Sequence, residues 1–173
     1  MDHHQTPPAA ADTDFLTLDA QLCFALYSAQ LAMGKIYRRQ LADLGLTYPQ
    51  YLVMLVLWES DGITVTALGE RLYLDSATLT PLLKRLQALG LLRRDRVLAD
   101  QRQVCVTLTA AGRDLKQRAA DVPQGVFCAT GCTPDHARVL KAELEELRTH
   151  LLTASVSPEN RAVRGSARRT PRV

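Results

Sequence analysis

The chain has 173 residues, of which 47% are hydrophobic, and its formal net charge is +3. This length and composition predict one domain with a buried core, flanked by tails. The sequence contains no run of about 18 uncharged apolar residues, so no membrane span is predicted. The first residues lack the basic and apolar regions of a signal peptide, so we expect a cytoplasmic protein.

Charge is distributed unevenly along the chain. Residues 1–13 are polar and rich in Pro and Ala, which predicts a disordered N-terminus. Residues 155–173 hold five Arg and one Glu and are typical of a flexible basic tail. Between the tails, residues 63–113 carry eight basic and four acidic residues. A local basic region on a near-neutral body indicates a nucleic-acid face.

The first half of the chain has a helical pattern. Residues 15–33 predict an amphipathic helix, and the segment IYRRQLADLG that follows closes at Gly45. The next segment, TYPQYLVMLVLWES, begins with Thr47 as N-cap and has Pro49 in its first turn. This segment is apolar nearly all round, as a central buried helix would be.

Two short helices follow. The first, TVTALGERLYL, has Thr64 or Thr66 as its cap. The second, DSATLTPLLKRLQALG, has capping options at Asp75 and Ser76 and stops at Gly90. A tight turn joins the two.

A hairpin and two further helices complete the pattern. LLRRDRV and VCVTLT predict paired strands, with the polar VLADQRQ as the tip between them. TAAGRDLKQRAADVP begins another helix. The last amphipathic helix, TPDHARVLKAELEELRTHLL, is capped by Thr133 and has Pro134 in its first turn.

The order helix, turn, helix, hairpin predicts a winged helix-turn-helix, so the fold class is mainly α with a small β-hairpin wing (α+β). The second short helix would enter the major groove, and Arg102 at the hairpin tip would enter the adjacent minor groove. Leucines on the opposite side would bind that helix to the core: Leu79, Leu82, Leu83 and Leu86. The predicted DNA contacts are Ser76, Thr78, Thr80, Lys84, Arg85, Arg94 and Arg102.

The chain has four cysteines: Cys23, Cys105, Cys128 and Cys132. Permanent disulfides are not expected in a reducing cytosol. There is no Cys-x-x-Cys pair, and the histidines complete no known ligand spacing, so no metal or other cofactor is predicted. Taken alone, a cysteine here is more typical of a small buried hydrophobe than of a reactive group.

Several segments resemble the MarR family of winged-helix repressors, most closely its two-cysteine organic hydroperoxide sensors (OhrR-like). These segments are LCFALYSA, LTYPQYLVMLVLWE, LGERLYLDSATLTPLLKRL, GLLRRDR, DQRQVCVTLT and VPQGVFC. The resemblance covers residues 15–153 and implies an obligate homodimer that binds double-stranded operator DNA. Asp100 and Arg102 match the acidic–x–Arg motif of the family's wing tip, so Asp100 joins the predicted DNA site.

The resemblance also divides the chain. Residues 14–154 would form one MarR-like domain, with dimerisation helices at 14–45 and 112–154 and the winged helix-turn-helix at 46–111.

The resemblance further assigns a redox site. The family's peroxide-reactive cysteine falls on Cys23, its tyrosine partners fall on Tyr37 and Tyr48, and its resolving cysteine falls on Cys128. Cys132 lies close in sequence and is a possible substitute resolver. We add Tyr27, one turn after Cys23, as a further candidate for thiolate hydrogen bonding or for the pocket. Cys105 matches no role in the family and is interpreted as buried filler.

The chemistry explains why tyrosines are needed. A thiol reacts with a peroxide as its thiolate, and no Lys, Arg or His lies within one turn of Cys23. Phenolic O–H groups would supply the missing stabilisation. In one helix the 14 residues from Cys23 to Tyr37 span about 21 Å, so a partner subunit would have to supply the tyrosine. Phe24 and Leu26, with Trp58 as a further candidate, would form an apolar pocket that favours organic hydroperoxides.

Oxidation would then be the switch. Cys23 would become a sulfenic acid and form an intersubunit disulfide, which moves the DNA-binding lobes and releases the operator. Three alternatives stay open from the sequence: a thiol peroxidase, a MarR-type repressor released by a small aromatic ligand or by hypochlorite, and an architectural DNA binder that relies on the basic tail. A groove-reading helix and wing have no catalytic use, which argues against an enzyme.

Overall fold

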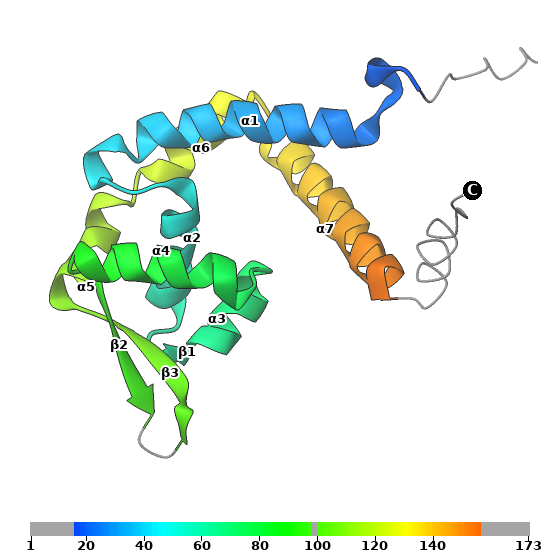
Figure 1. The fold of residues 1–173 in the computed structure, drawn as a ribbon. Helices are drawn as coiled ribbons and strands as arrows, with labels where there is room; N and C mark the ends of the chain where they lie inside the picture. The colour runs from blue at the N-terminus through cyan, green and yellow to red at the C-terminus, as the bar shows by residue number, and fades with distance from the viewer. Residues whose placement is uncertain (1–15, 98–99, 157–173) are drawn as a thin grey trace, which may run out of the picture. The chain divides into compact units, whose positions relative to one another are not determined.

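The computed structural model describes residues 16–97 and 100–156, with side chains left out at 97, 100–102 and 156. Its contacts divide the chain into two compact units, with the boundary between Ala129 and Thr130 (Figure 1). Within the described ranges, no helix is both long and apolar enough to span a bilayer.

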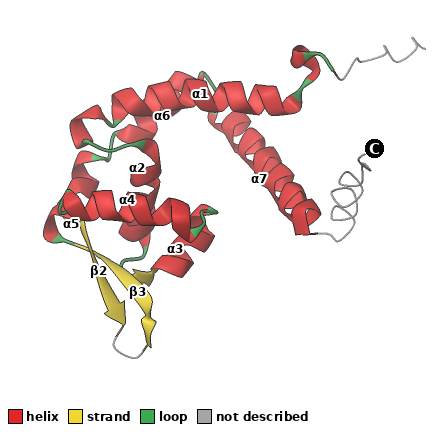
Figure 2. Ribbon diagram, viewed as in Figure 1, coloured by secondary structure: helices red, strands yellow, loops and turns green. Residues whose placement is uncertain are grey.

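Helices dominate the described chain, and the strands are confined to one small sheet (Figure 2). In chain order the elements are η1 (Leu18–Ala20), α1 (Leu22–Gln40), η2 (Ala42–Leu44), α2 (Tyr48–Glu59), β1 (Ile63–Thr64), α3 (Val65–Leu72), α4 (Ser76–Ala88), β2 (Leu92–Val97), β3 (Asp100–Leu108), α5 (Ala110–Arg118), α6 (Val122–Thr130) and α7 (Pro134–Val156). The predicted fold class is confirmed.

Local sequence determines where the central helices begin. The N–H of Thr47 donates to Oε1 of Gln50 at 2.8 Å, which forms the capping box that starts α2. The carboxylate of Asp75 accepts from the N–H of Thr78 at 2.6 Å and caps α4. Both predicted caps are confirmed, with Asp75 as the residue that caps α4.

Two further helix starts, those of α3 and α7, follow the same rule. The hydroxyl of Thr64 accepts from the N–H of Ala67 at 3.1 Å, so Thr64 caps α3 and Thr66 lies in its first turn. Thr133 accepts from the N–H of His136 at 3.3 Å at the start of α7, as predicted. The helix predicted at 15–33 instead begins at Leu22, after η1, and runs without a break to Gln40. The predicted stop is confirmed, because η2 follows α1 and is capped by Gly45 with φ 66°.

The wing is a three-stranded antiparallel sheet in the order β1-β3-β2. The predicted pairing is confirmed, with Leu92 opposite Leu108 and Arg94 opposite Val106. The predicted tip at 97–103 was too long, because β3 already begins at Asp100. The third strand, β1, pairs with β3 and was not predicted from the sequence. It has only two residues, which is too short for an alternating pattern to be recognised.

The core lies between α2, α3, α4, the base of the wing, α5 and α6. Leu79, Leu83 and Leu86 of α4 are buried as predicted, and Leu82 is half-buried. The helix that was expected to run on from Thr109 is broken into α5 and α6 by a turn after Ala119.

The ends of the chain are only partly described. Helix α7 continues to Val156, so the first two residues of the predicted tail 155–173 are helical. Residues 157–173 and the predicted disordered segment 1–13 lie outside the described residues. The prediction of dimerisation helices at 14–45 and 112–154 stays a prediction.

Asp61 joins three elements at the base of the wing. Its Oδ1 accepts from the N–H groups of Gly62 at 2.9 Å and Leu108 at 2.8 Å. Its Oδ2 lies 3.1 Å from Nη1 of Arg113, which also donates to the carbonyl of Leu108 at 3.0 Å. The end of α2, the end of β3 and the first turns of α5 are therefore tied together.

The first turn of α5 approaches the turn between α4 and β2 very closely. A Cβ on Gly112 would lie 2.0 Å from the carbonyl oxygen of Leu91 and 3.2 Å from Cδ2 of Leu108. The N–H of Thr109, the N-cap of α5, donates to the same Leu91 carbonyl at 3.1 Å. No side chain fits at position 112 without a shift of backbone.

We expect Gly112→Ala to lower the free energy of unfolding by about 3 kcal/mol, the upper part of the usual range for overpacking, because backbone atoms must move. Urea unfolding at a fixed protein concentration measures the change. Gly34→Ala is the matched control, since nothing lies within 4 Å of its added Cβ in α1. It should raise stability by about 0.5–1 kcal/mol. Equal stabilities of the two variants would contradict the close contact.

Candidate nucleic-acid interface and thiol site

Helix α4 presents a polar face to solvent. Ser76, Thr78, Lys84 and Arg85 are all exposed along it. In Figure 1 the β2–β3 hairpin projects away from the helices of the first unit. A polar helix face beside a projecting hairpin is the geometry with which winged helix-turn-helix proteins approach DNA.

Thr80 differs from the other predicted contacts on α4. It is half-buried, and its hydroxyl donates to the carbonyl of Ser76 at 2.7 Å. Its proton is therefore used within the helix, and only the oxygen lone pairs could face DNA. A contact through Thr80 stays a prediction.

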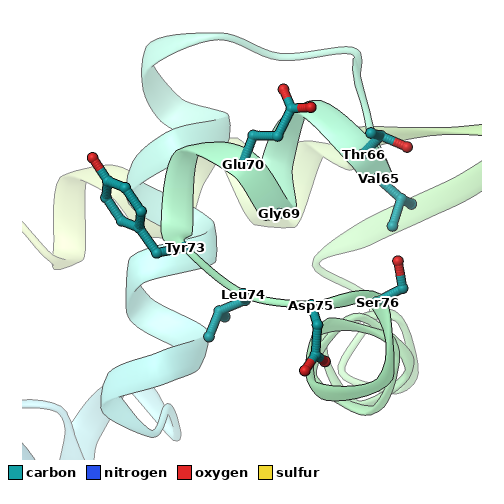
Figure 3. Close-up of a pocket in the computed structure, with 8 residues that line it drawn as sticks. All are labelled: Val65, Thr66, Gly69, Glu70, Tyr73, Leu74, Asp75 and Ser76. Atoms are coloured by element: carbon teal, nitrogen blue, oxygen red, sulfur yellow. The ribbon is translucent and has the colours of Figure 1, made fainter. Parts of the chain in front are cut away.

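A hollow of about 500 Å³ lies between α3 and the first turn of α4 (Figure 3). Figure 3 places Glu70 and Asp75 on opposite sides of it, with Thr66 and Ser76 together at one end. Hydrogen bonds from Thr78 lower the pKa of Asp75, so its carboxylate stays charged.

The turn that closes this hollow is tight. Tyr73 adopts a left-handed conformation with φ 56°, and the N–H of Leu74 donates to the carbonyl of Gly69 at 2.9 Å. A Cβ on Gly69 would lie 2.8 Å from the Leu74 carbonyl, so glycine is required there. The turn fixes the angle between α3 and α4. Helix α4 is the helix predicted to enter the major groove and is called the reading helix below.

Arg94 connects the reading helix to the wing. Its Nε donates to Oε1 of Gln87, at the end of α4, at 2.7 Å. The sequence analysis did not identify Gln87. Its position in the last turn of α4, three residues before Gly90, was the available signal that it lies near the strand that follows. Asp100 and Arg102 belong to β3, but their side chains lie outside the described residues. Their predicted contacts stay predictions.

Cys23 lies in the first turn of α1 and is exposed, as is Tyr27 one turn later. Helix α1 continues without a break to Gln40, so Cys23 and Tyr37 belong to the same helix. Their 14-residue separation therefore spans about 21 Å, and they do not meet within one subunit.

Tyr37 and Tyr48 do meet within the subunit. Their ring centroids are 4.0 Å apart, and Tyr37 is half-buried. Burial, the neighbouring phenols of Tyr48 and Tyr51, and a hydrogen bond with Tyr48 raise the pKa of Tyr37 to about 12. Tyr37 is therefore protonated at any physiological pH.

Two aromatic residues of α2 extend this pair, and sequence reasoning did not connect them to it. Tyr51 is 2% exposed and its centroid lies 6.2 Å from that of Tyr37. Burial raises the pKa of Tyr51 as well. Trp58 packs edge-on against Tyr51 at 6.1 Å, and its indole N–H donates to the carbonyl of Gly112 at 2.8 Å.

The other thiols lie on β3, on α6 and in the loop between α6 and α7, and none of the four cysteines forms a disulfide. Cys128 is exposed on α6 and accepts from Nε2 of Gln124 at 3.4 Å. Cys132 is half-buried just before α7. Cys105 lies on β3 between Thr64 and Asp95 and is half-buried, so it is less enclosed than the expected buried filler.

Comparisons with known proteins identify the family. A family model described as "Transcriptional regulator SarA/Rot" matches residues 35–119. The chain is 50% identical over 150 residues to the HTH-type transcriptional regulator TtmR of Methylorubrum extorquens, covering 87% of this chain and 77% of that one. It is 43% identical over 134 residues to the organic hydroperoxide resistance transcriptional regulator of Bacillus subtilis, covering 78% of this chain and 91% of that one.

Solved structures agree with this result. Reduced AbfR bound to DNA superposes with a TM-score of 0.66 at 37% identity, over 78% of this chain and 93% of that one. Disulfide-formed AbfR superposes with a TM-score of 0.59 at 36% identity, over 78% and 92%. These relatives are DNA-binding regulators and not enzymes, as the sequence predicted. The chain belongs to the MarR-like family of winged-helix transcriptional regulators that includes the SarA/Rot regulators and the organic hydroperoxide resistance regulator.

Proposed function

We propose that this regulator is a homodimeric repressor that organic hydroperoxides release from its operator by oxidising Cys23. The observation that carries the proposal is the geometry of α1. One continuous helix holds an exposed cysteine at its start and, about 21 Å away, a tyrosine that pairs with Tyr48. The thiol and the phenols can form one site only if two subunits supply them.

The phenol pair is suited to stabilise a thiolate. Two phenols have two O–H protons, and the hydrogen bond between Tyr37 and Tyr48 uses one of them. The second remains to donate to the sulfur of Cys23 from the partner subunit. The raised pKa of Tyr37, about 12, keeps this phenol protonated, so Tyr37 holds its bond to Tyr48 and leaves the O–H of Tyr48 to face the sulfur. Tyr27, one turn after Cys23, would line the same site.

The first step is a two-electron oxidation of sulfur. The Cys23 thiolate attacks the terminal oxygen of the hydroperoxide, so that an S–O bond forms and the O–O bond breaks. The alkoxide leaves and takes up a proton to become the alcohol. Exposed apolar side chains beside Cys23, including Phe24, would hold the alkyl group and favour organic over hydrogen peroxide.

The second step forms a disulfide between subunits. The thiol of Cys128 attacks the sulfenic sulfur, an S–S bond forms, and the S–O bond breaks with release of water. The exposure of Cys128 on α6 supports this role, and Cys132 remains the possible substitute. The disulfide draws α1 of one subunit and α6 of the other together, which changes the spacing of the two reading helices.

The relatives support this reading in two ways. The Bacillus subtilis relative is by name an organic hydroperoxide resistance regulator, and AbfR has been solved both reduced on DNA and with a disulfide formed. Reduced protein would bind the operator through α4 and the wing. A regulator of this kind works where the chromosome is, so we place it in the cytoplasm.

Cys23→Ser should bind the operator as the wild type does but remain bound after treatment with cumene hydroperoxide, because serine forms no sulfenic acid. A gel shift run before and after oxidation measures this. Cys105→Ser is the matched control and should release DNA normally. Release of Cys23→Ser by the hydroperoxide would refute the sensor role.

Cys128→Ser should abolish the covalent dimer that the oxidised wild type forms, because no thiol reaches the sulfenic acid. Non-reducing electrophoresis shows the dimer directly, and Cys132→Ser should retain it. The assignment of the resolving thiol is reversed if Cys132→Ser loses the dimer and Cys128→Ser keeps it.

Arg85→Ala should weaken operator binding, and the slope of log affinity against log salt should become smaller by about one, as expected for one lost phosphate contact. Arg38→Ala removes the same charge from the exposed end of α1 and should leave the slope unchanged. Fluorescence anisotropy over a salt series measures both. Equal slopes for the wild type and Arg85→Ala would show that Arg85 makes no phosphate contact and would contradict the assignment of α4 as the reading helix.

A further inference from the structure

The Tyr37–Tyr48 pair continues into the core along α2. The centroids of Tyr37 and Tyr51 are 6.2 Å apart, and those of Tyr51 and Trp58 are 6.1 Å apart with the rings edge-on. Both distances lie in the range of direct aromatic contact. The rings of Tyr48, Tyr37, Tyr51 and Trp58 therefore form a continuous series of contacts. Tyr37 belongs to α1, and the other three extend from the start of α2 almost to its end.

The chain of contacts leaves α2 through the indole of Trp58, whose N–H donates to the Gly112 carbonyl at 2.8 Å. The N–H of Gly112 donates to Oγ1 of Thr109 at 3.1 Å, and this hydroxyl donates to the Gly90 carbonyl at 2.6 Å. Gly90 and Leu91 form the turn between α4 and β2. The contacts thus end where the reading helix passes into the wing.

This final junction has no free space. A Cβ on Gly112 would lie 2.0 Å from the Leu91 carbonyl, so the backbones of α5 and of the α4–β2 turn are already in contact. Close-packed groups transmit a displacement instead of absorbing it. A shift of the Trp58 ring must therefore either move the turn or break the indole hydrogen bond.

We propose that Trp58 is a positioning residue that couples the Tyr37–Tyr48 pair to the α4–β2 turn, so that a rearrangement of the pair on oxidation shifts the reading helix and wing. The inference rests on the proposed function: a disulfide that draws α1 and α6 together would displace Tyr37, which lies on α1. When Tyr37 moves, Tyr51 loses a packing partner and the Trp58 ring follows. The indole N–H then carries the displacement to Gly112.

A second link between α2 and α5 provides a control. Nζ of Lys116 donates to the main-chain carbonyl of Trp58 at 3.2 Å. This contact joins the same two helices without involving the indole ring. A variant that lacks the Lys116 bond loosens the contact between α2 and α5 in general but leaves the indole bond and the aromatic contacts intact. It therefore distinguishes these two effects.

The first test uses the wild-type dimer. Trp58 is the single tryptophan of the chain, so its fluorescence reports this one position. Cumene hydroperoxide should change the emission of the reduced protein, and Cys23→Ser should show no change. If the wild type forms its covalent dimer and releases the operator while the emission of Trp58 stays constant, the proposal is wrong.

The second test uses Trp58→Phe, which keeps a ring against Tyr51 but has no N–H for Gly112. Reduced Trp58→Phe should bind the operator within about twofold of the wild type and should oxidise at the same rate. The ratio of the oxidised to the reduced Kd should fall by about fivefold, the equilibrium value of one hydrogen bond. Lys116→Met should keep the wild-type ratio. An unchanged ratio in Trp58→Phe, or an equal fall in Lys116→Met, overturns the coupling role.

The two levels of the argument fail separately. If oxidised wild type keeps the operator, or if Cys23→Ser releases it, the proposed function fails and the coupling role fails with it. If oxidation releases the wild type but not Cys23→Ser, the proposed function stands. The emission of Trp58 and the two Kd ratios then decide the coupling role alone.

Discussion

The contact between the first turn of α5 and the α4–β2 turn is the constraint that holds α4, the wing and α5 together. These three elements are called the lobe below. Gly112 leaves no room for a side chain there, and Thr109 bonds to both residues of the turn. Asp61 holds the same junction from the end of α2 through the N–H of Leu108. The reading helix, the wing and α5 are therefore fixed relative to one another, so the lobe meets DNA with a set geometry.

The first part of α1 has the opposite character. None of its residues is buried, and large apolar side chains such as Leu22, Tyr27 and Leu31 are exposed. Burying such surface is worth about 25 cal/mol for each Å², so covering this face would stabilise it. Cys23 lies on this segment. Under the proposed function, the reactive thiol would therefore lie where packing depends on the partner subunit.

The sequence predicted whatever depends on neighbours along the chain. Both cap bonds join residues three positions apart: the N–H of Thr47 donates to the side chain of Gln50, and the carboxylate of Asp75 accepts from the N–H of Thr78. The role of Asp61 could not be predicted, since its acceptor bond reaches Leu108, 47 residues further on. The proposed redox site follows the same division. The length of α1 already separated Cys23 from Tyr37, whereas Tyr51 lies in a helix that is apolar nearly all round and could not be distinguished from ordinary core.

The relative strengths of the Tyr37–Tyr48 contact and of the backbone contact at Gly112 determine which part of the structure would move on oxidation. The bond between the phenols of Tyr37 and Tyr48 and their ring contact are each worth about 1 kcal/mol. The backbone contact at Gly112 cannot yield without unpacking the lobe. A disulfide that pulls on α1 and α6 would therefore separate the phenols first, and the stiff end of the ring chain would move as a body. Under the proposed function, a weak contact between the phenols and an unyielding one at Gly112 would turn a local change at Cys23 into a changed orientation of α4 and the wing.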